Sequence, residues 1–158
     1  RPSARVVLLK GVDDGGFIFY TNTRSRKGRE LAADARVALT IWWPHLGWQV
    51  RVEGTAAPVT DAEADAYFAT RARGSQLGAW ASEQSEPLAS RSELEARLAE
   101  LTARFADRPV PRPPHWSGYR VTPAMIELWK SRPDRLHERE QYTRATPASP
   151  WTMRMLNP

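Results

Sequence analysis

Four short groups of polar residues supply the side chains with which this sequence could do chemistry. In the first, Ser25-Arg26-Lys27, two cations occupy the predicted first turn of a helix. The helix dipole disfavours cations at that end, so their presence indicates that a dianion such as a phosphate group binds there. A solvated basic turn explains the same residues, and the motif is weak when taken alone.

The second group combines a phenol, a guanidinium and a hydroxyl. Tyr67 and Arg71 are four residues apart on a predicted helix, and Ser75 follows just beyond its end. Such side chains can hold a phosphate jointly. The alternative is a surface helix on which the arginine stacks against the tyrosine.

The third group is the run RLHER at residues 135–139, predicted to lie in a strand. Alternation along a strand predicts that Arg135, His137 and Arg139 share one face, with Leu136 on the other. Three potential cations on one face repel one another unless an anion or a wet cavity offsets them. An exposed strand with a polar outer face is the competing interpretation.

The fourth group consists of amides, Gln49 and Gln84, the latter followed by Ser85. Gln49 lies in a β-rich run, where a buried amide is costly unless it is hydrogen-bonded. It could meet the polar edge of a ring-shaped cofactor, or equally a neighbouring strand.

Several kinds of chemistry find no support. The sequence has no cysteine, its three histidines lack metal-ligand spacing, and no catalytic triad or nucleotide-binding loop is evident. We therefore predict no metal site, but a reaction driven by a bound cofactor. The net charge of +5 suggests an anionic partner. Because the basic residues form no single run, small phosphorylated ligands suit them better than nucleic acid. No apolar run approaches the ~18 residues of a membrane span.

These groups need a scaffold of short strands with interspersed helices. We predict an α+β fold, an antiparallel barrel with helical decoration, in which Gly54 marks a bulge. Capping boxes predict helices starting at Thr60 and Ser90, and the second helix has Leu94, Leu98, Leu101 and Phe105 on one face. The other helices are predicted at 25–33 and 75–81, and the strands at 5–9, 17–21, 36–43, 48–59, 118–121, 125–130, 135–142 and 151–156.

Taken in order, these groups and their neighbours resemble the pyridoxamine 5′-phosphate oxidase family. Each matching run is weak alone, but their ordered co-occurrence over nearly the whole chain is highly specific. The runs are residues 5–10 (RVVLLK), 19–22 (FYTN), 25–27 (SRK), 49–54 (QVRVEG), 67–68 (YF), 71, 75–82 (SQLGAWAS), 84–85 (QS), 116–119 (WSGY), 126–129 (IELW), 135–139 (RLHER) and the terminal 151–158.

The resemblance implies one domain over residues 1–158, a split β-barrel that binds flavin mononucleotide (FMN). It implies a cytoplasmic homodimer with flavins at the subunit interface, and a first strand and mobile arm before residue 1. The implied cofactor contacts are Arg5, Val6, Val7, Leu8, Leu9, Lys10, Tyr20, Thr21, Arg26, Lys27, Gln49, Gln84, Ser85, Trp129 and Arg139. The implied substrate contacts are Lys10, Tyr67, Arg71, Ser75, Arg135, Leu136 and His137, with Arg135 and His137 covering the reacting ring as the candidate catalytic residues.

The implied reaction is oxidation of pyridoxamine or pyridoxine 5′-phosphate to pyridoxal 5′-phosphate, with dioxygen as acceptor and hydrogen peroxide released. A related flavin oxidase of secondary metabolism, of the phenazine-pathway type, is the main alternative. A non-catalytic flavin or pyridoxal phosphate carrier and a nucleic-acid-binding barrel are the others. The chain departs from the family pattern at Trp48, usually Arg, at Glu138, usually Asp, and at Ala72 and Lys130, often Pro and Gln.

Overall fold

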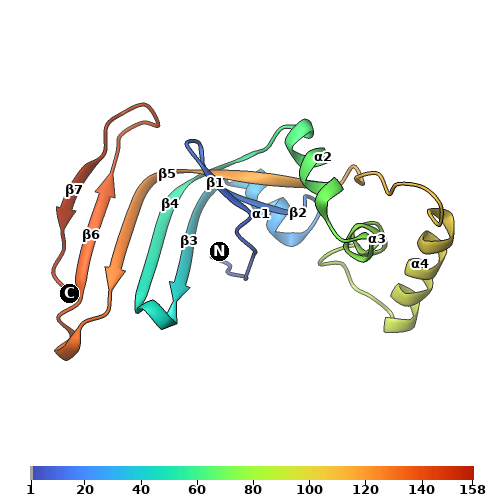
Figure 1. Ribbon diagram of the computed structural model, residues 1–158, viewed down its shortest axis with the longest axis horizontal. Coiled ribbons are helices and arrows are strands. Elements are labelled where there is room, and N and C mark those ends of the chain that lie inside the picture. Colours follow the sequence, from blue (N-terminus) through green and yellow to red (C-terminus); the bar gives the residue numbers. More distant parts are fainter. Residues whose placement is uncertain (1) are drawn as a thin grey trace. The chain divides into compact units, whose positions relative to one another are not determined.

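The computed structural model describes residues 2–158 and has an α+β architecture, as predicted (Figure 1). Strands hydrogen-bond in the order β1-β2-β5-β4-β3, with β6 paired to β5 and β7 to β6. The strands are β1 Gly11–Asp13, β2 Gly16–Asn22, β3 Arg36–Trp43, β4 Trp48–Pro58, β5 Trp116–Lys130, β6 Glu138–Thr143 and β7 Thr152–Met155. The α-helices are α1 Arg26–Ala33, α2 Asp61–Thr70, α3 Arg73–Ala81 and α4 Arg91–Arg104, and two short 3₁₀ turns are η1 Pro44–Leu46 and η2 Pro133–Arg135.

Side-chain caps fix where three of the helices begin. The Ser25 hydroxyl accepts a hydrogen bond from the Gly28 amide at 3.3 Å and starts α1. At α2, Thr60 accepts from the Glu63 amide while the Glu63 carboxylate accepts from the Thr60 amide, which completes the predicted capping box. Ser90 accepts from the backbone amide three residues on and starts α4. These caps satisfy amides that a helix leaves without partners at its N-terminus.

The described residues group into two compact units. The first unit contains residues 2–10, Ile18–Asp34 and Pro58–Tyr119. Its core is an aromatic and aliphatic cluster to which α4 contributes the predicted apolar face through Leu101 and Phe105. The Tyr20 ring stacks on Tyr67 at 4.0 Å and on Trp116 at 5.3 Å between centroids, so β2, α2 and the start of β5 are joined by aromatic contacts.

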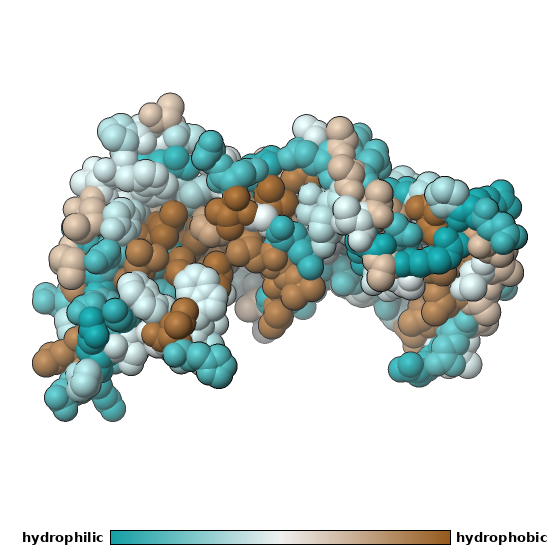
Figure 2. Space-filling view, in the orientation of Figure 1, coloured by the Kyte–Doolittle hydropathy of each residue, from teal (hydrophilic) through white to brown (hydrophobic). Residues whose placement is uncertain are grey.

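The second unit contains Gly11–Phe17, Ala35–Ala57 and Arg120–Pro158. Its strands β3 and β4 form a continuous antiparallel ladder from the pair Arg36 and Thr55 to the pair Trp43 and Trp48. Strands β5, β6 and β7 are also antiparallel neighbours. Apolar side chains reach the surface over the strands at the left of Figure 2. The exposed large apolar residues of this unit are Val12, Trp42, Trp43, Leu46, Leu136, Trp151, Met153 and Met155.

The predicted strand at 5–9 is wrong for this chain. Residues 2–10 have no regular structure, although the Lys10 amide donates to the Ile18 carbonyl at 2.8 Å. Val6 is 95% exposed. A β-branched sequence forms a strand only where a neighbour pairs with it. The hairpin to β2 therefore uses the short strand Gly11–Asp13.

Two further predictions about strands are corrected. The segments 118–121 and 125–130 belong to one strand, Trp116–Lys130, which continues through Pro123 because the fixed φ of proline is compatible with extended backbone. Gly54 does not mark a bulge in the β3–β4 ladder. A Cβ atom at Gly54 would lie 2.2 Å from the Thr122 carbonyl oxygen, so the glycine permits close approach of β5.

Candidate functional site

A pocket of about 700 Å³ lies in the first unit. Strand β2, helices α1, α2 and α3 and the irregular residues near the N-terminus all contribute to its wall. Most first-unit residues predicted to bind a ligand lie in this wall. The lining residues are Val6, Val7, Leu8, Lys10, Tyr20, Thr21, Asn22, Lys27, Tyr67, Thr70, Arg71, Ala72, Ser75, Gly78, Ala79, Ser82, Gln84 and Trp116.

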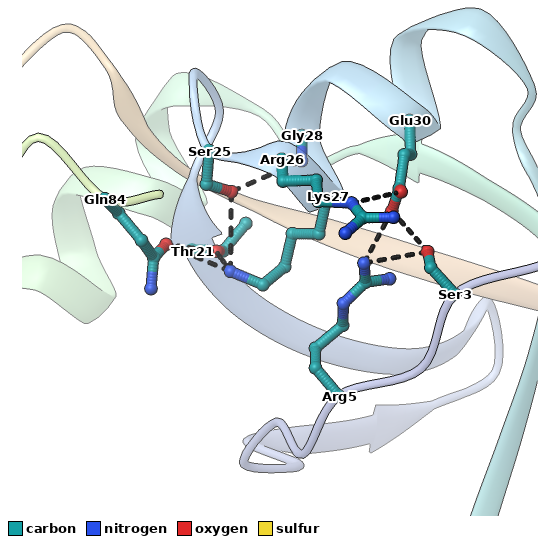
Figure 3. A network of polar contacts seen from close by, with 9 residues as sticks. All are labelled: Ser3, Arg5, Thr21, Ser25, Arg26, Lys27, Gly28, Glu30 and Gln84. Carbon is teal, nitrogen blue, oxygen red and sulfur yellow. Dashed lines mark hydrogen bonds and ion pairs between the residues drawn. The ribbon is translucent and has the colours of Figure 1, made fainter. Parts of the chain in front are cut away.

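At one side of the pocket, Lys27 presents an ammonium group to uncharged acceptors. Its Nζ donates to Thr21 Oγ1 at 2.6 Å, to Gln84 Oε1 at 3.0 Å and to Ser25 Oγ at 3.4 Å (Figure 3). Burial lowers the pKa of the Lys27 ammonium, and the positive charge of Arg5 lowers it further. A partly desolvated cation among neutral acceptors is stabilised by a bound anion, so this corner fits a phosphate group.

Arg5 and Arg26 are not among the residues that line the pocket, but both contact Glu30. Arg5 Nη2 lies 2.5 Å from Glu30 Oε2, and Arg26 Nε donates to Glu30 Oε1 at 2.9 Å (Figure 3). The Ser3 hydroxyl donates to Glu30 Oε2 at 2.6 Å. Hydrogen bonds from Ser3, Arg5 and Arg26 lower the pKa of Glu30 to about 2. We call Arg5, Arg26 and Glu30 the arginine–carboxylate cluster.

At the Arg71 end of the pocket, a guanidinium nitrogen is buried without a partner. The Arg71 guanidinium lies over the rings of Trp116 and Phe68, at 4.8 Å and 5.6 Å from their centroids. Its Nη1 has no hydrogen-bond partner within residues 2–158, and burial lowers the pKa of the group. A buried donor left unsatisfied costs roughly 1–3 kcal/mol. Arg71 is therefore prepared to donate to an anion in the pocket.

Tyr67, Ser75 and Lys10 complete this end of the pocket. Lys10 Nζ is 6.0 Å from the centroid of the Tyr67 ring. Ser75 lies inside α3, which begins at Arg73 rather than at Ser75 as predicted. The three residues of the second sequence group and Lys10 therefore line one cavity. Arg71 is the C-cap residue beyond the last residue of α2, not part of the helix as predicted. Leu9 and Ser85, also predicted contacts, are not among the lining residues.

The other predicted site residues belong to the second unit, and the predicted shared strand face is wrong. Arg135 ends the turn Pro133–Arg135 with a φ of 61°, and His137 precedes β6. Alternation along a strand therefore does not apply to them. The His137 ring packs on Trp129 at 4.4 Å between centroids, and its Nδ1 accepts from the Arg132 amide at 3.2 Å.

Arg139 lies in β6 and is held by a buried carboxylate. Its Nε donates to Glu127 Oε1 at 2.9 Å and its Nη1 donates to the Asn157 carbonyl at 3.0 Å. Glu127 is 3% exposed and also contacts Arg51. Gln49 is opposite Trp42 in the β3–β4 ladder, and Leu136 is 68% exposed.

Two carboxylates, Glu30 and Glu127, are not among the site residues predicted from the sequence. Glu30 follows Arg26 by four residues, a spacing at which side chains on a helix pair, so the sequence alone indicates this ion pair. Glu127 is the one charged residue in the apolar run IELW, and a lone carboxylate there requires a cationic partner. Trp116 belongs to the run WSGY that resembles the family, but its place beneath Arg71 depends on tertiary contacts.

None of the helices within residues 2–158 is both long enough and apolar enough to cross a membrane. Within the same range, no three side chains of His, Cys, Asp or Glu are grouped as metal ligands would be.

Comparisons with known proteins give consistent matches over the whole chain. Residues 1–105 match the family model described as pyridoxamine 5′-phosphate oxidase. Residues 116–158 match the pyridoxine 5′-phosphate oxidase C-terminal dimerisation region. A pyridoxine/pyridoxamine 5′-phosphate oxidase from Rubrobacter xylanophilus is 61% identical over 158 residues, which are all of this chain and 72% of that protein. One from Myxococcus xanthus is 60% identical, with 76% of its length covered.

Solved structures agree on the fold. The crystal structure of PhzG from Burkholderia lata 383, in complex with tetrahydrophenazine-1-carboxylic acid, superposes with a TM-score of 0.93 at 37% identity and covers 100% of this chain and 76% of that one. A pyridoxamine 5′-phosphate oxidase-related, FMN-binding protein from Nostoc punctiforme has a TM-score of 0.77 at 17% identity, with 100% and 81% covered.

Proposed function

Because this chain belongs to the pyridoxamine 5′-phosphate oxidase family, we propose that it oxidises pyridoxamine or pyridoxine 5′-phosphate to pyridoxal 5′-phosphate. The family predicted from the ordered motifs is confirmed, and with it an FMN-dependent oxidoreductase that forms a homodimer. The substrate, the residues that bind it and a cytoplasmic location are proposals. The domain boundaries 1–158 stay a prediction.

The observation that carries the proposed substrate is the buried, unpartnered Nη1 of Arg71. A phosphate oxygen would accept from this nitrogen, and the Ser75 hydroxyl and the Tyr67 phenol would supply further donors from the same wall. Lys10 adds a second positive charge. A substrate without a phosphate would leave the desolvated guanidinium unpaired, so the pocket favours phosphorylated rings.

The cofactor phosphate is assigned to the side of the pocket that contains Lys27. Lys27, Thr21 and Gln84 would hold it, with Arg5 and Arg26 as neighbouring cations. When bound there, FMN would supply a hydride acceptor for the substrate carbon and a two-electron donor for dioxygen, which with two protons would be released as hydrogen peroxide. The protein's part is to bind and orient the two rings, an effect that can contribute ~7–11 kcal/mol in well-oriented systems.

Residues of the second unit are proposed to contact the substrate ring and the flavin. Arg135 and His137 would cover the ring and bond its polar substituents, and Gln49, Trp129 and Arg139 would contact the flavin. For the amine substrate, a hydride and a proton leave the aminomethyl group, and water then replaces the nitrogen, which departs as ammonia. The orientation of the His137 ring is fixed by its packing on Trp129 and by the hydrogen bond at Nδ1.

The alternative function is oxidation of a different ring, favoured by the likeness to PhzG at a TM-score of 0.93. Aerobic assays with pyridoxamine 5′-phosphate, pyridoxine 5′-phosphate and unphosphorylated pyridoxamine separate the two functions. We expect hydrogen peroxide and pyridoxal 5′-phosphate to form in equal amounts from the phosphorylated amine. No turnover of either phosphorylated vitamer by the FMN-loaded protein would favour the alternative, or a non-catalytic carrier if no other ring is oxidised.

A further inference from the structure

Glu30 joins two arginines that come from different parts of the chain. Arg5 lies in the irregular segment before β1, and Arg26 is the first residue of α1. One oxygen of the Glu30 carboxylate contacts Arg5 and Ser3, while the other accepts from Arg26 Nε (Figure 3). The carboxylate therefore bridges two guanidinium groups that would otherwise repel each other.

The bridge uses only part of each guanidinium. Arg26 gives its Nε to Glu30, which leaves its two Nη groups for another acceptor. Arg5 Nη2 donates to both Ser3 Oγ and Glu30 Oε2, which leaves the Nε and Nη1 groups of Arg5 for another acceptor. Arg5 is also close enough to lower the pKa of Lys27. Arg5 and Arg26 thus contact one carboxylate, and Arg5 is at the same time close to Lys27.

We propose that Glu30 is a positioning residue for the cofactor phosphate. Its carboxylate sets the spacing of Arg5 and Arg26 before the phosphate arrives, and it does not itself contact the phosphate. This inference rests on the proposed function, in which Arg5 and Arg26 are cations next to the FMN phosphate. Preorganised donors bind more tightly than donors that must be brought together against their own repulsion.

Positioning by Glu30 and simple charge attraction predict opposite effects on FMN affinity when the carboxylate is removed. The substitution Glu30→Gln makes the cluster more positive, which would by attraction alone tighten binding of an anion. If the carboxylate acts by positioning, Glu30→Gln weakens FMN binding instead. Residues in one ion-pair network are commonly coupled strongly enough for a roughly tenfold change in affinity.

The matched control is Glu95→Gln. Arg91 and Glu95 form the same kind of pair on α4, with Nε and Oε1 2.7 Å apart and the arginine four residues before the glutamate. They are not among the residues that line the pocket. Removal of this carboxylate therefore reproduces the loss of an exposed helical ion pair without touching the arginine–carboxylate cluster.

The experiment is a titration of the full-length, flavin-free dimer with FMN, followed by flavin fluorescence. We expect Glu30→Gln to raise the Kd roughly tenfold, Glu95→Gln to leave it unchanged, and Glu30→Asp to lie between, because a shorter side chain reaches one guanidinium only. In an Arg26→Ala background, Glu30→Gln should change the Kd about twofold or less, since one partner of the bridge is gone.

Three outcomes would overturn the inference. An unchanged or lower Kd for Glu30→Gln shows that the carboxylate does not position the arginines, while FMN binding by the parent protein leaves the proposed function intact. An undiminished effect in the Arg26→Ala background shows that Glu30 acts otherwise than through Arg26. Absence of FMN binding by the parent protein overturns the proposed function and this inference together.

Discussion

Replacement of Arg71 by methionine should separate substrate binding from stability. Arg71→Met keeps an unbranched side chain against Trp116 and Phe68 but removes the guanidinium. In the protein without ligands, this change removes a buried donor that has no partner, which stabilises the folded state by roughly 1–3 kcal/mol. It also removes contacts with two aromatic rings, each worth about 0.5–1 kcal/mol. The two effects nearly cancel, and the difference makes the ligand-free Arg71→Met protein slightly more stable than the parent protein.

Catalysis should respond in the opposite direction. A hydrogen bond to a charged group contributes about 1.5–3 kcal/mol, so loss of one phosphate contact lowers kcat/KM for pyridoxamine 5′-phosphate by roughly 10- to 150-fold. Any turnover of unphosphorylated pyridoxamine should be unaffected. Steady-state kinetics with both amines, together with thermal unfolding of the flavin-free protein, measure these effects. A lower thermal midpoint with unchanged kinetics would refute the assignment, because Arg71 would then be structural.

Three further predictions concern stability. Glu127→Gln removes the buried carboxylate between two partly exposed arginines and should cost about 1.5–3 kcal/mol in urea unfolding; a loss below ~1 kcal/mol would show that the pair is effectively solvated. Thr60→Ala removes the cap of α2 and should cost about 1 kcal/mol, or roughly 2–4 °C in the thermal midpoint, whereas an unchanged midpoint would mean that the cap is dispensable. Because the pKa of Glu30 falls from 4.5 to about 2 on folding, the stabilisation by its carboxylate is present above pH ~4.5 and is lost as the pH falls towards ~2. The difference in urea midpoint between the parent protein and Glu30→Gln should shrink over that range, and a constant difference would contradict it.

Features set by local sequence could be predicted. The capping residues Ser25, Thr60 and Ser90 define helix starts because their hydrogen bonds span only three residues. The four-residue spacing of Tyr67 and Arg71 predicts that the two side chains lie close together, and both line one pocket, although Arg71 is the C-cap residue just beyond α2. The ladder of β3 with β4 follows from two β-rich runs joined by a short turn.

Features that depend on distant partners or on rare backbone conformations could not be predicted. Residues 5–9 have β-propensity, but whether they pair is decided elsewhere in the fold. Arg135 and its predecessor Asp134 have φ values of 61° and 56°, a left-handed conformation that residue type alone rarely reveals. The stacking of Arg71 over Trp116 joins positions 45 residues apart along the chain, and no local pattern predicts such a contact.

The proposed function requires that this chain bind FMN and a phosphorylated amine together, with the amine as electron donor. The most direct test is the visible absorbance of the FMN-loaded protein during anaerobic addition of pyridoxamine 5′-phosphate. We predict that the yellow flavin band bleaches in proportion to added amine and returns when air is admitted. A flavin band that stays oxidised at saturating amine, in protein that retains its FMN, would contradict the account.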